Sequence, residues 1–379
     1  MTDLIDQPLL LTPGPLTTDP RTRQAMTRDW GSRDKRFSAL VSGLRQRLVA
    51  LVNGGDDYVC VPVQGSGTFA VEATLGTLLP RDGRSLVLIN GAYGRRVATI
   101  VERLGRGLAT YETAEDTPPD PAEVARLLAA DPAIGHVVMI HCETTAGLIN
   151  PLPEIAEVCR AAGRRLIVDA MSSFGVLPID ARALGVEAVV ASSNKGLEGP
   201  PGVGFALIAR EALKDCAGRA HSLSLDLFDQ WKAMEATGQW RFTPPTHVLA
   251  GFGQAVDLFI AEGGQPGRAA RYRNNCRILV EGMQALGFEA LLPPALQAPV
   301  IVTFRMPADP RFDFERFYDR LSARGYVIYP GKLTVAPSFR IGCIGHLGAA
   351  EMEGALAAIR AVLGEMDVAS GAPVLAAAA

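Results

Sequence analysis

A single lysine, Lys195, stands where an apolar segment gives way to a loop rich in glycine and proline. Val189–Ala191 precede the small polar residues Ser192–Asn194, and Gly199–Gly204 follow the lysine. An amine at the end of a buried strand is partly removed from water, which favours its neutral form and makes it a nucleophile toward carbonyl groups. Most lysines lie on the surface, so on this pattern alone a solvated loop lysine is the alternative.

An aspartate, Asp169, directly follows a second apolar segment, Arg165–Val168. An unpaired carboxylate is costly to remove from water, so Asp169 requires a cationic or proton-donating partner. A third such segment, His136–Ile140, runs into the polar residues Glu143–Thr145. The carboxyl ends of parallel strands lie at one edge of a sheet, where open α/β folds bind ligands. We therefore expect these three polar ends to converge.

A glycine-rich turn, Gln64–Thr68, joins the apolar segment Tyr58–Val63 to a helical pattern. Glycine allows close approach of the backbone, and the free N–H groups at a helix start favour a phosphate. Ser66 and Thr68 add hydroxyl groups. The turn fits neither the P-loop nor the dinucleotide-binding spacing. It is a candidate phosphate site, with an ordinary tight turn capped by Ser66 as the alternative.

An aromatic residue, Tyr93, lies in Gly91–Gly94, immediately after the strand-like segment Ser85–Asn90. At the carboxyl end of a strand, an aromatic side chain is placed to stack on a flat ligand ring. A buried structural tyrosine is the alternative.

The elements that must position these residues alternate between strand and helix patterns from about residue 58 to 208. This alternation predicts a mainly parallel sheet with right-handed crossovers. A second α+β region follows, with strand patterns at 300–304 and 327–329 and helical patterns at 314–324 and 351–363. The fold class is thus α/β, with a large mainly parallel-sheet domain and a smaller C-terminal α+β domain.

The domain limits follow from these changes of pattern. We expect an extended segment, 1–20, on the small domain or a partner subunit, a large domain over 21–262, a small domain over 263–366, and a disordered tail over 367–379. One helical stretch, 267–286, carries an arginine-rich face that we expect to be solvated: Arg268, Arg271, Arg273 and Arg277.

The composition excludes several classes of protein. The formal net charge is −3 and no long basic run occurs, so neither nucleic acid nor an anionic membrane is an expected partner. No signal pattern and no apolar run of about 20 residues occurs. Six cysteines lie far apart without a CxxC pair, and there are five histidines, so we expect reduced thiols in the cytoplasm and no metal centre.

Taken together, these residues resemble the class V, fold-type I family of pyridoxal-phosphate enzymes, over nearly the whole chain. The resemblance is carried by six segments in order: Gly65–Thr68, Gly91–Gly94, Glu143–Gly147, Val168–Ala170, Ser193–Lys195 and Phe339–Gly342. The opening Leu11–Pro15 is similar to the N-terminal segment of the alanine–glyoxylate branch. Less specific similarities, at 29–34, 64–72 and 242–248, match the branch that converts 2-aminoethylphosphonate and pyruvate to phosphonoacetaldehyde and alanine.

The resemblance implies roles for the residues that meet the cofactor ring. Lys195 would form the Schiff base with pyridoxal 5'-phosphate and later act as the base for the proton shift. Asp169 would pair with the pyridinium nitrogen, so that the ring acts as an electron sink. Tyr93 would stack on the ring, and Thr145 would hydrogen-bond its 3-hydroxyl group. Better-known relatives carry tryptophan where Tyr93 stands.

The resemblance also implies which residues hold the phosphate and the substrate. Ser66, Gly67 and Thr68 would bind the cofactor phosphate, with Asn194 nearby, where better-known relatives carry glutamine. Thr243 would come from the neighbouring subunit of a homodimer with shared active sites. Arg340 would bind the carboxylate of pyruvate or alanine, or the phosphonate, and Arg33 is a further candidate for the phosphonate.

Other functions remain as alternatives at this level. An alanine– or serine–glyoxylate-type aminotransferase of the same family differs only in the less specific segments. A cysteine desulfurase is disfavoured, because Tyr93 and Asn194 stand where that family places histidines and Cys343 lies on an expected strand. A catalytically silent binding protein would be expected to lack Lys195 or Asp169, and a nucleotide-dependent oxidoreductase would need the dinucleotide fingerprint.

Overall fold

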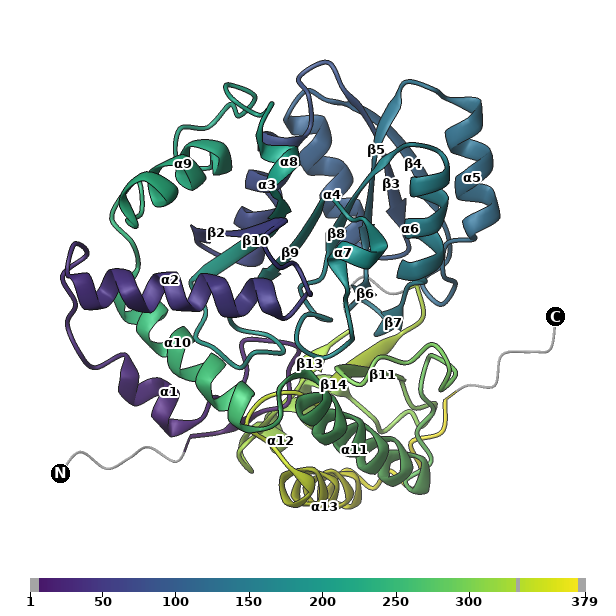
Figure 1. The fold of residues 1–379 in the computed structure, drawn as a ribbon. Coiled ribbons are helices and arrows are strands. Elements are labelled where there is room, and N and C mark those ends of the chain that lie inside the picture. The colour runs from purple at the N-terminus through teal and green to yellow at the C-terminus, as the bar shows by residue number, and fades with distance from the viewer. Residues whose placement is uncertain (1–6, 332–334, 374–379) are drawn as a thin grey trace.

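A seven-stranded sheet forms the centre of the larger part of the chain (Figure 1). The computed structural model describes residues 7–331 and 335–373. The strands of this sheet are β2 (Tyr58–Gln64), β3 (Arg84–Ile89), β4 (Gly107–Glu112), β5 (Ile134–Ile140), β8 (Arg165–Asp169), β9 (Ala188–Ser192) and β10 (Val203–Ala209).

The strand order is β2–β10–β9–β8–β5–β3–β4. All neighbours pair in parallel except β10, which is antiparallel to both β2 and β9. Because β2 and β9 both oppose β10, the six other strands run in one direction and end at one edge of the sheet. The predicted mainly parallel sheet is confirmed. Strand β4 was not predicted, because as an edge strand it has no buried residue and therefore no apolar run.

Helices cover both faces of the sheet, and each face has its own hydrophobic core. On one face lie α3 (Gly67–Leu78) and α4 (Ala92–Arg103), with α8 (Arg210–Leu213) and α9 (Leu227–Thr237). The other face carries α2 (Lys35–Ala50), α5 (Pro121–Ala130), α6 (Leu152–Ala161), α7 (Ala181–Leu184) and α10 (Thr246–Ala261), against which α1 (Pro20–Ala25) packs. A sheet covered on both faces has continuous apolar strands, as in β5 and β8.

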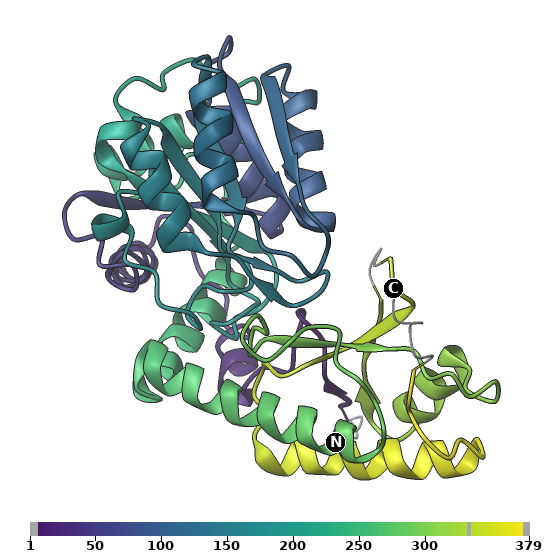
Figure 2. The ribbon, with the colours of Figure 1, turned by 90° about the vertical axis from the view of Figure 1, so that its right-hand side faces the viewer.

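The C-terminal part is a smaller unit around a three-stranded antiparallel sheet of β11 (Ile301–Arg305), β14 (Ser338–Gly342) and β13 (Tyr329–Pro330). Helices α11 (Gly264–Ala285), α12 (Phe314–Ser322) and α13 (Ala349–Glu365) pack with it around a third core. Figure 2 shows α11 and α13 side by side below this sheet. The N-terminal segment joins the unit, because β1 (Leu9–Leu10) pairs in parallel with β12 (Tyr326–Val327).

The arginine-rich face of α11 differs from the prediction. Arg273 and Arg277 are exposed, whereas Arg268 is only 1% exposed and Arg271 is half-buried. The guanidinium groups of Arg268 and Arg271 both pair with Glu198 and Glu262. These carboxylates compensate the desolvation of the arginines, and helical periodicity gives no sign of them because Glu198 lies on a distant loop.

The predicted disordered tail over 367–379 is wrong for its first part. Val368 is buried, the Gly371 N–H donates to the Leu286 carbonyl at 2.9 Å, and the Ala308 N–H donates to the Ala372 carbonyl at 2.7 Å. Residues 374–379, like residues 1–6, lie outside the described part of the chain. No helix among the residues that the structure describes is both long and apolar enough to cross a membrane.

Candidate active site

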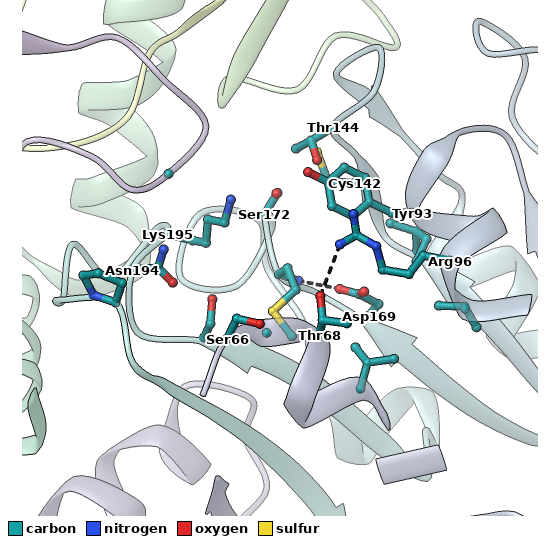
Figure 3. A pocket seen from close by; sticks show the side chains of 18 of the residues that line it. Ser66, Thr68, Tyr93, Arg96, Cys142, Thr144, Asp169, Ser172, Asn194 and Lys195 are labelled. Carbon is teal, nitrogen blue, oxygen red and sulfur yellow. Dashed lines mark hydrogen bonds between the residues drawn. The ribbon is translucent and has the colours of Figure 1, made fainter. Parts of the chain in front are cut away.

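A cavity of about 310 Å³ lies at the edge of the sheet where the parallel strands end (Figure 3). Its walls come from the β2–α3 turn, the first turns of α4, the ends of β5, β8 and β9, and the N-terminal segment. The predicted site residues that line it are Ser66, Gly67, Thr68, Tyr93, Asp169, Asn194 and Lys195. Thr144, from the third polar strand end, lines the cavity as well, so the expected convergence of three polar strand ends is confirmed.

Lys195 meets the N-terminal segment in this cavity. Its Nζ donates a hydrogen bond to the Pro13 carbonyl at 2.5 Å. Gly14 lies against the same side chain, with a φ of +109°, and a Cβ at Gly14 would fall 2.8 Å from Lys195 Cδ. The site therefore depends on a glycine at position 14. Sequence reasoning did not assign Pro13 or Gly14 to the site, although the Pro-Gly-Pro turn was the available signal.

Asp169 ends β8 as a buried carboxylate on the cavity wall. Its Oδ1 accepts the Met171 N–H at 2.9 Å. Burial is the main cause that raises the pKa of Asp169 to about 6, and the nearby Glu143 also raises this pKa. The hydrogen bond from Met171 and the charges of Lys195 and Arg96 act in the opposite direction. A cationic or proton-donating ligand in the cavity would therefore stabilise the charged form of this buried carboxylate.

Glu143, a second buried carboxylate, holds the start of α4. It accepts the Gly94 N–H at 3.3 Å and the Thr145 N–H at 3.0 Å. Burial raises the pKa of Glu143, and these hydrogen bonds oppose that shift. A Cβ at Gly91 would lie 2.4 Å from Glu143 Cδ, so helix and carboxylate approach closely only because residue 91 is glycine.

Of two neighbouring threonines, the cavity wall contains Thr144 and not Thr145. The Thr145 hydroxyl donates to Glu143 Oε1 at 2.5 Å and accepts the Ala92 N–H at 2.9 Å. It therefore ties β6 (Cys142–Glu143) to α4, and it is not presented to a ligand in the way that the resemblance implied. The short hairpin of β6 with β7 (Leu148–Ile149) decides which threonine faces the cavity.

The turn that begins α3 keeps its polar groups toward the cavity. Ser66 is the N-cap residue, but its side chain makes no capping hydrogen bond, which speaks against the ordinary capped turn. A Cβ at Gly67 would lie 2.4 Å from Met171 Sδ, so a larger residue at position 67 would displace the Met171 side chain on the cavity wall. The structure thus leaves a helix start and the Ser66 hydroxyl facing the cavity, an arrangement that suits an anion.

Tyr93 lies in the first turn of α4, and its ring is 4.9 Å from the Arg96 guanidinium carbon. Arg96 Nη1 also donates to Thr68 Oγ1 at 3.2 Å, as the dashed line in Figure 3 marks. Sequence reasoning missed Arg96, although its position three residues after Tyr93 places both on one helix face.

Three further candidates do not line the cavity. Arg340, on β14, is buried behind the wall and donates to the carbonyls of Thr144 and Pro330, each at 3.1 Å; burial lowers the pKa of Arg340. Arg33 is exposed just before α2. Thr243 borders a separate hollow with Phe69 and Phe242. In the described part of the chain, no group of three or more His, Cys, Asp or Glu side chains is arranged to hold a metal ion.

Comparison with known proteins agrees with this geometry. The model of the aminotransferase class-V family matches residues 21–344. The chain therefore belongs to the class-V aminotransferases, a family of fold-type I enzymes whose cofactor is pyridoxal phosphate.

Two curated relatives have the same name. The chain is 58% identical to the 2-aminoethylphosphonate–pyruvate transaminase of Pseudomonas fluorescens strain Pf-5, over 96% of this chain and 99% of that protein. It is 56% identical to the protein of that name from Pseudomonas putida strain KT2440, over 95% and 98%. Among solved structures, the ureidoglycine–glyoxylate aminotransferase of Bacillus subtilis has a TM-score of 0.88 and 25% identity, covering 96% of this chain and 94% of that one.

The residues of the cavity fit this cofactor. The buried carboxylate of Asp169 suits a protonated ring nitrogen, and the uncapped start of α3 suits a phosphate. The Lys195 amine lines the same cavity, whose volume of about 310 Å³ lies at the lower end of the range for small-molecule sites.

Proposed function

We propose that this protein transfers the amino group of 2-aminoethylphosphonate to pyruvate, which gives phosphonoacetaldehyde and L-alanine. The observation that carries this proposal is the identity of 55–58% over nearly the full length to relatives of that name. The cavity supports it chemically, because a lysine and a buried carboxylate line the same wall.

Lys195 and Asp169 would perform the acid–base steps. Lys195 Nζ would hold the cofactor, and as a free amine it would act as the base that removes a proton from the carbon that carries the amino group. The Pro13 carbonyl orients this amine from one side. Asp169 keeps the ring nitrogen protonated. When bound, pyridoxal phosphate supplies an electron sink for the charge left by proton removal.

The remaining contacts orient the cofactor and the substrate. Ser66, Gly67 and Thr68, with Asn194, would bind the phosphate, and Tyr93 would stack on the ring. We assign the ring hydroxyl to Thr144, because this residue lines the cavity and the Thr145 hydroxyl is used by Glu143 and Ala92. Arg340 acts on the anionic end of the substrate from behind Thr144.

A homodimer would complete the site. Phe69 and Phe242 are 50% and 49% exposed, and both line a hollow of about 440 Å³ beside Thr243. Exposed aromatic side chains around one hollow favour a protein partner. A second copy covering this face brings Thr243 to the neighbouring cofactor phosphate. The six cysteines are free and buried, which favours the reducing environment of the cytoplasm.

The test is a half-reaction on protein reconstituted with pyridoxal phosphate. Adding 2-aminoethylphosphonate alone should convert the absorbance of the bound cofactor to that of its aminated form, and pyruvate should restore it. Lys195→Ala should abolish both changes. Taurine, which replaces the phosphonate by a sulfonate, is the matched control. A response to alanine or serine with glyoxylate, without one to the phosphonate, would transfer the function to the glyoxylate-type alternative.

A further inference from the structure

Arg96 presents a positive charge in the cavity wall that no carboxylate of the described residues pairs with. Its neighbour Arg95 forms an exposed ion pair with Glu112. Arg96 forms no ion pair among the residues that the structure describes, although its field lowers the pKa of Asp169. Apart from Lys195, it is the one cationic side chain among the described residues that line the cavity. Because Arg96 is partly buried and has no ion pair among the described residues, an anionic ligand would stabilise its charge more than that of a surface arginine.

The contacts of Arg96 fix where that anion would lie. Nη1 donates to the hydroxyl of Thr68, at 3.2 Å, and Thr68 stands in the first turn of α3. The guanidinium carbon lies 4.9 Å from the centre of the Tyr93 ring. Arg96 therefore links two parts of the wall, the turn proposed for the phosphate and the ring proposed to stack on the cofactor, as Figure 3 shows.

The turn at Ser66–Thr68 does not by itself supply enough positive charge to balance a bound phosphate. A bound phosphate carries about −1.5 to −2 charges near neutral pH, whereas a helix start supplies about half a positive charge and hydroxyl groups are neutral. A cation near the turn would balance the remaining charge of the phosphate.

We propose that Arg96 is the cationic partner of the cofactor phosphate, and that it fixes the Thr68 hydroxyl toward that phosphate. The site then distinguishes pyridoxal phosphate from unphosphorylated pyridoxal through Arg96. This inference rests on the proposed placement of the phosphate at Ser66–Thr68, and it does not depend on the identity of the amino donor.

The experiment measures dissociation constants for pyridoxal phosphate and for pyridoxal, without any amino substrate, by equilibrium dialysis. Arg96→Gln should weaken the affinity for pyridoxal phosphate by about 10- to 100-fold, the range of a lost charge-assisted hydrogen bond. Its affinity for pyridoxal should stay within about twofold of the original value. Arg96→Lys, which keeps the charge but not the planar geometry, should fall between. Arg95→Gln is the matched control and should bind both ligands normally.

Two results would overturn the proposal. Equal weakening for both ligands would mean that Arg96 acts on the ring through Tyr93, and unchanged discrimination would mean that it has no role at the phosphate. If Arg96→Gln does not fold, as judged by circular dichroism, Arg96→Lys carries the same comparison. Thr68→Val and Ser66→Ala test the phosphate placement separately. If these two variants lose discrimination and the Arg96 variants keep it, the placement holds and the role of Arg96 is refuted.

Discussion

Replacing Asp169 by asparagine should stabilise the cofactor-free protein and weaken its hold on the cofactor. The reason is the buried carboxylate, whose pKa burial raises from 3.8 to about 6. Its charged form is therefore disfavoured in the folded state. The resulting penalty is absent below the unfolded pKa, grows as the pH rises from 3.8 to about 6, and is constant above that.

The magnitude follows from the same two values. The difference between 3.8 and about 6 corresponds to about 3 kcal/mol of destabilisation above pH 6, at about 1.4 kcal/mol for each pH unit. Roughly half of it develops between about pH 5 and pH 8. The asparagine side chain of the variant carries no charge at any pH, so the variant does not bear this penalty. The stability difference between variant and original protein should therefore shift by about 1 to 2 kcal/mol in favour of the variant over that range.

The assay is urea unfolding of both cofactor-free proteins at the two pH values. Asp309→Asn is the control, because the hydrogen bond with Arg311 holds the pKa of Asp309 at about 2, so its contribution to stability does not change between about pH 5 and pH 8. With pyridoxal phosphate bound, the order should reverse, since asparagine cannot form an ion pair with the protonated ring nitrogen. A difference between Asp169→Asn and the original protein that is independent of pH would refute the reasoning.

Three other changes test separate parts of the structure. Gly14→Ala should lower kcat/KM at least about tenfold and destabilise the fold by about 1–3 kcal/mol. The reason is that the added Cβ would clash with the Lys195 side chain and that residue 14 has a φ of +109°. Normal kinetics would contradict the close approach of Gly14 to Lys195. Glu198→Gln should destabilise the fold by about 3 kcal/mol, because the buried Arg268 then loses one of its two carboxylate partners and keeps only Glu262. Thermal unfolding at matched cofactor concentration measures this change. Phe242→Asp should dissociate the homodimer in sedimentation experiments, whereas Phe242→Leu should preserve it; a dimeric aspartate variant would place the interface elsewhere.

The parts of the site that the sequence predicted are those set by strand ends. Lys195, Asp169 and the Ser66–Thr68 turn each follow an apolar strand, and the parallel sheet brings such ends to one edge whatever the details of packing. The alternation of strand and helix patterns in the sequence was therefore enough to predict that these residues converge.

What could not be predicted depends on contacts between distant residues or within a turn. The choice between Thr144 and Thr145 is made by a short hairpin, whose geometry no periodicity encodes. The burial of Arg268 depends on Glu198, 70 residues earlier in the chain. The place of Arg96 depends on how α4 lies against α3. The position of Thr243 at a cofactor requires a second chain, so it remains a prediction.

The N-terminal segment sets the order in which this enzyme can be assembled. Leu9 pairs with Tyr326, which is synthesised 317 residues later, and the Pro13–Gly14 turn that contacts Lys195 lies just beyond this pairing. At about 5–20 residues per second, the first strand waits roughly 15 to 60 s for its partner. The sheet of the larger unit, complete at Ala209, precedes β12 along the chain. The wall beside the reactive amine is therefore among the last parts to close, and a chain released before residue 326 lacks it.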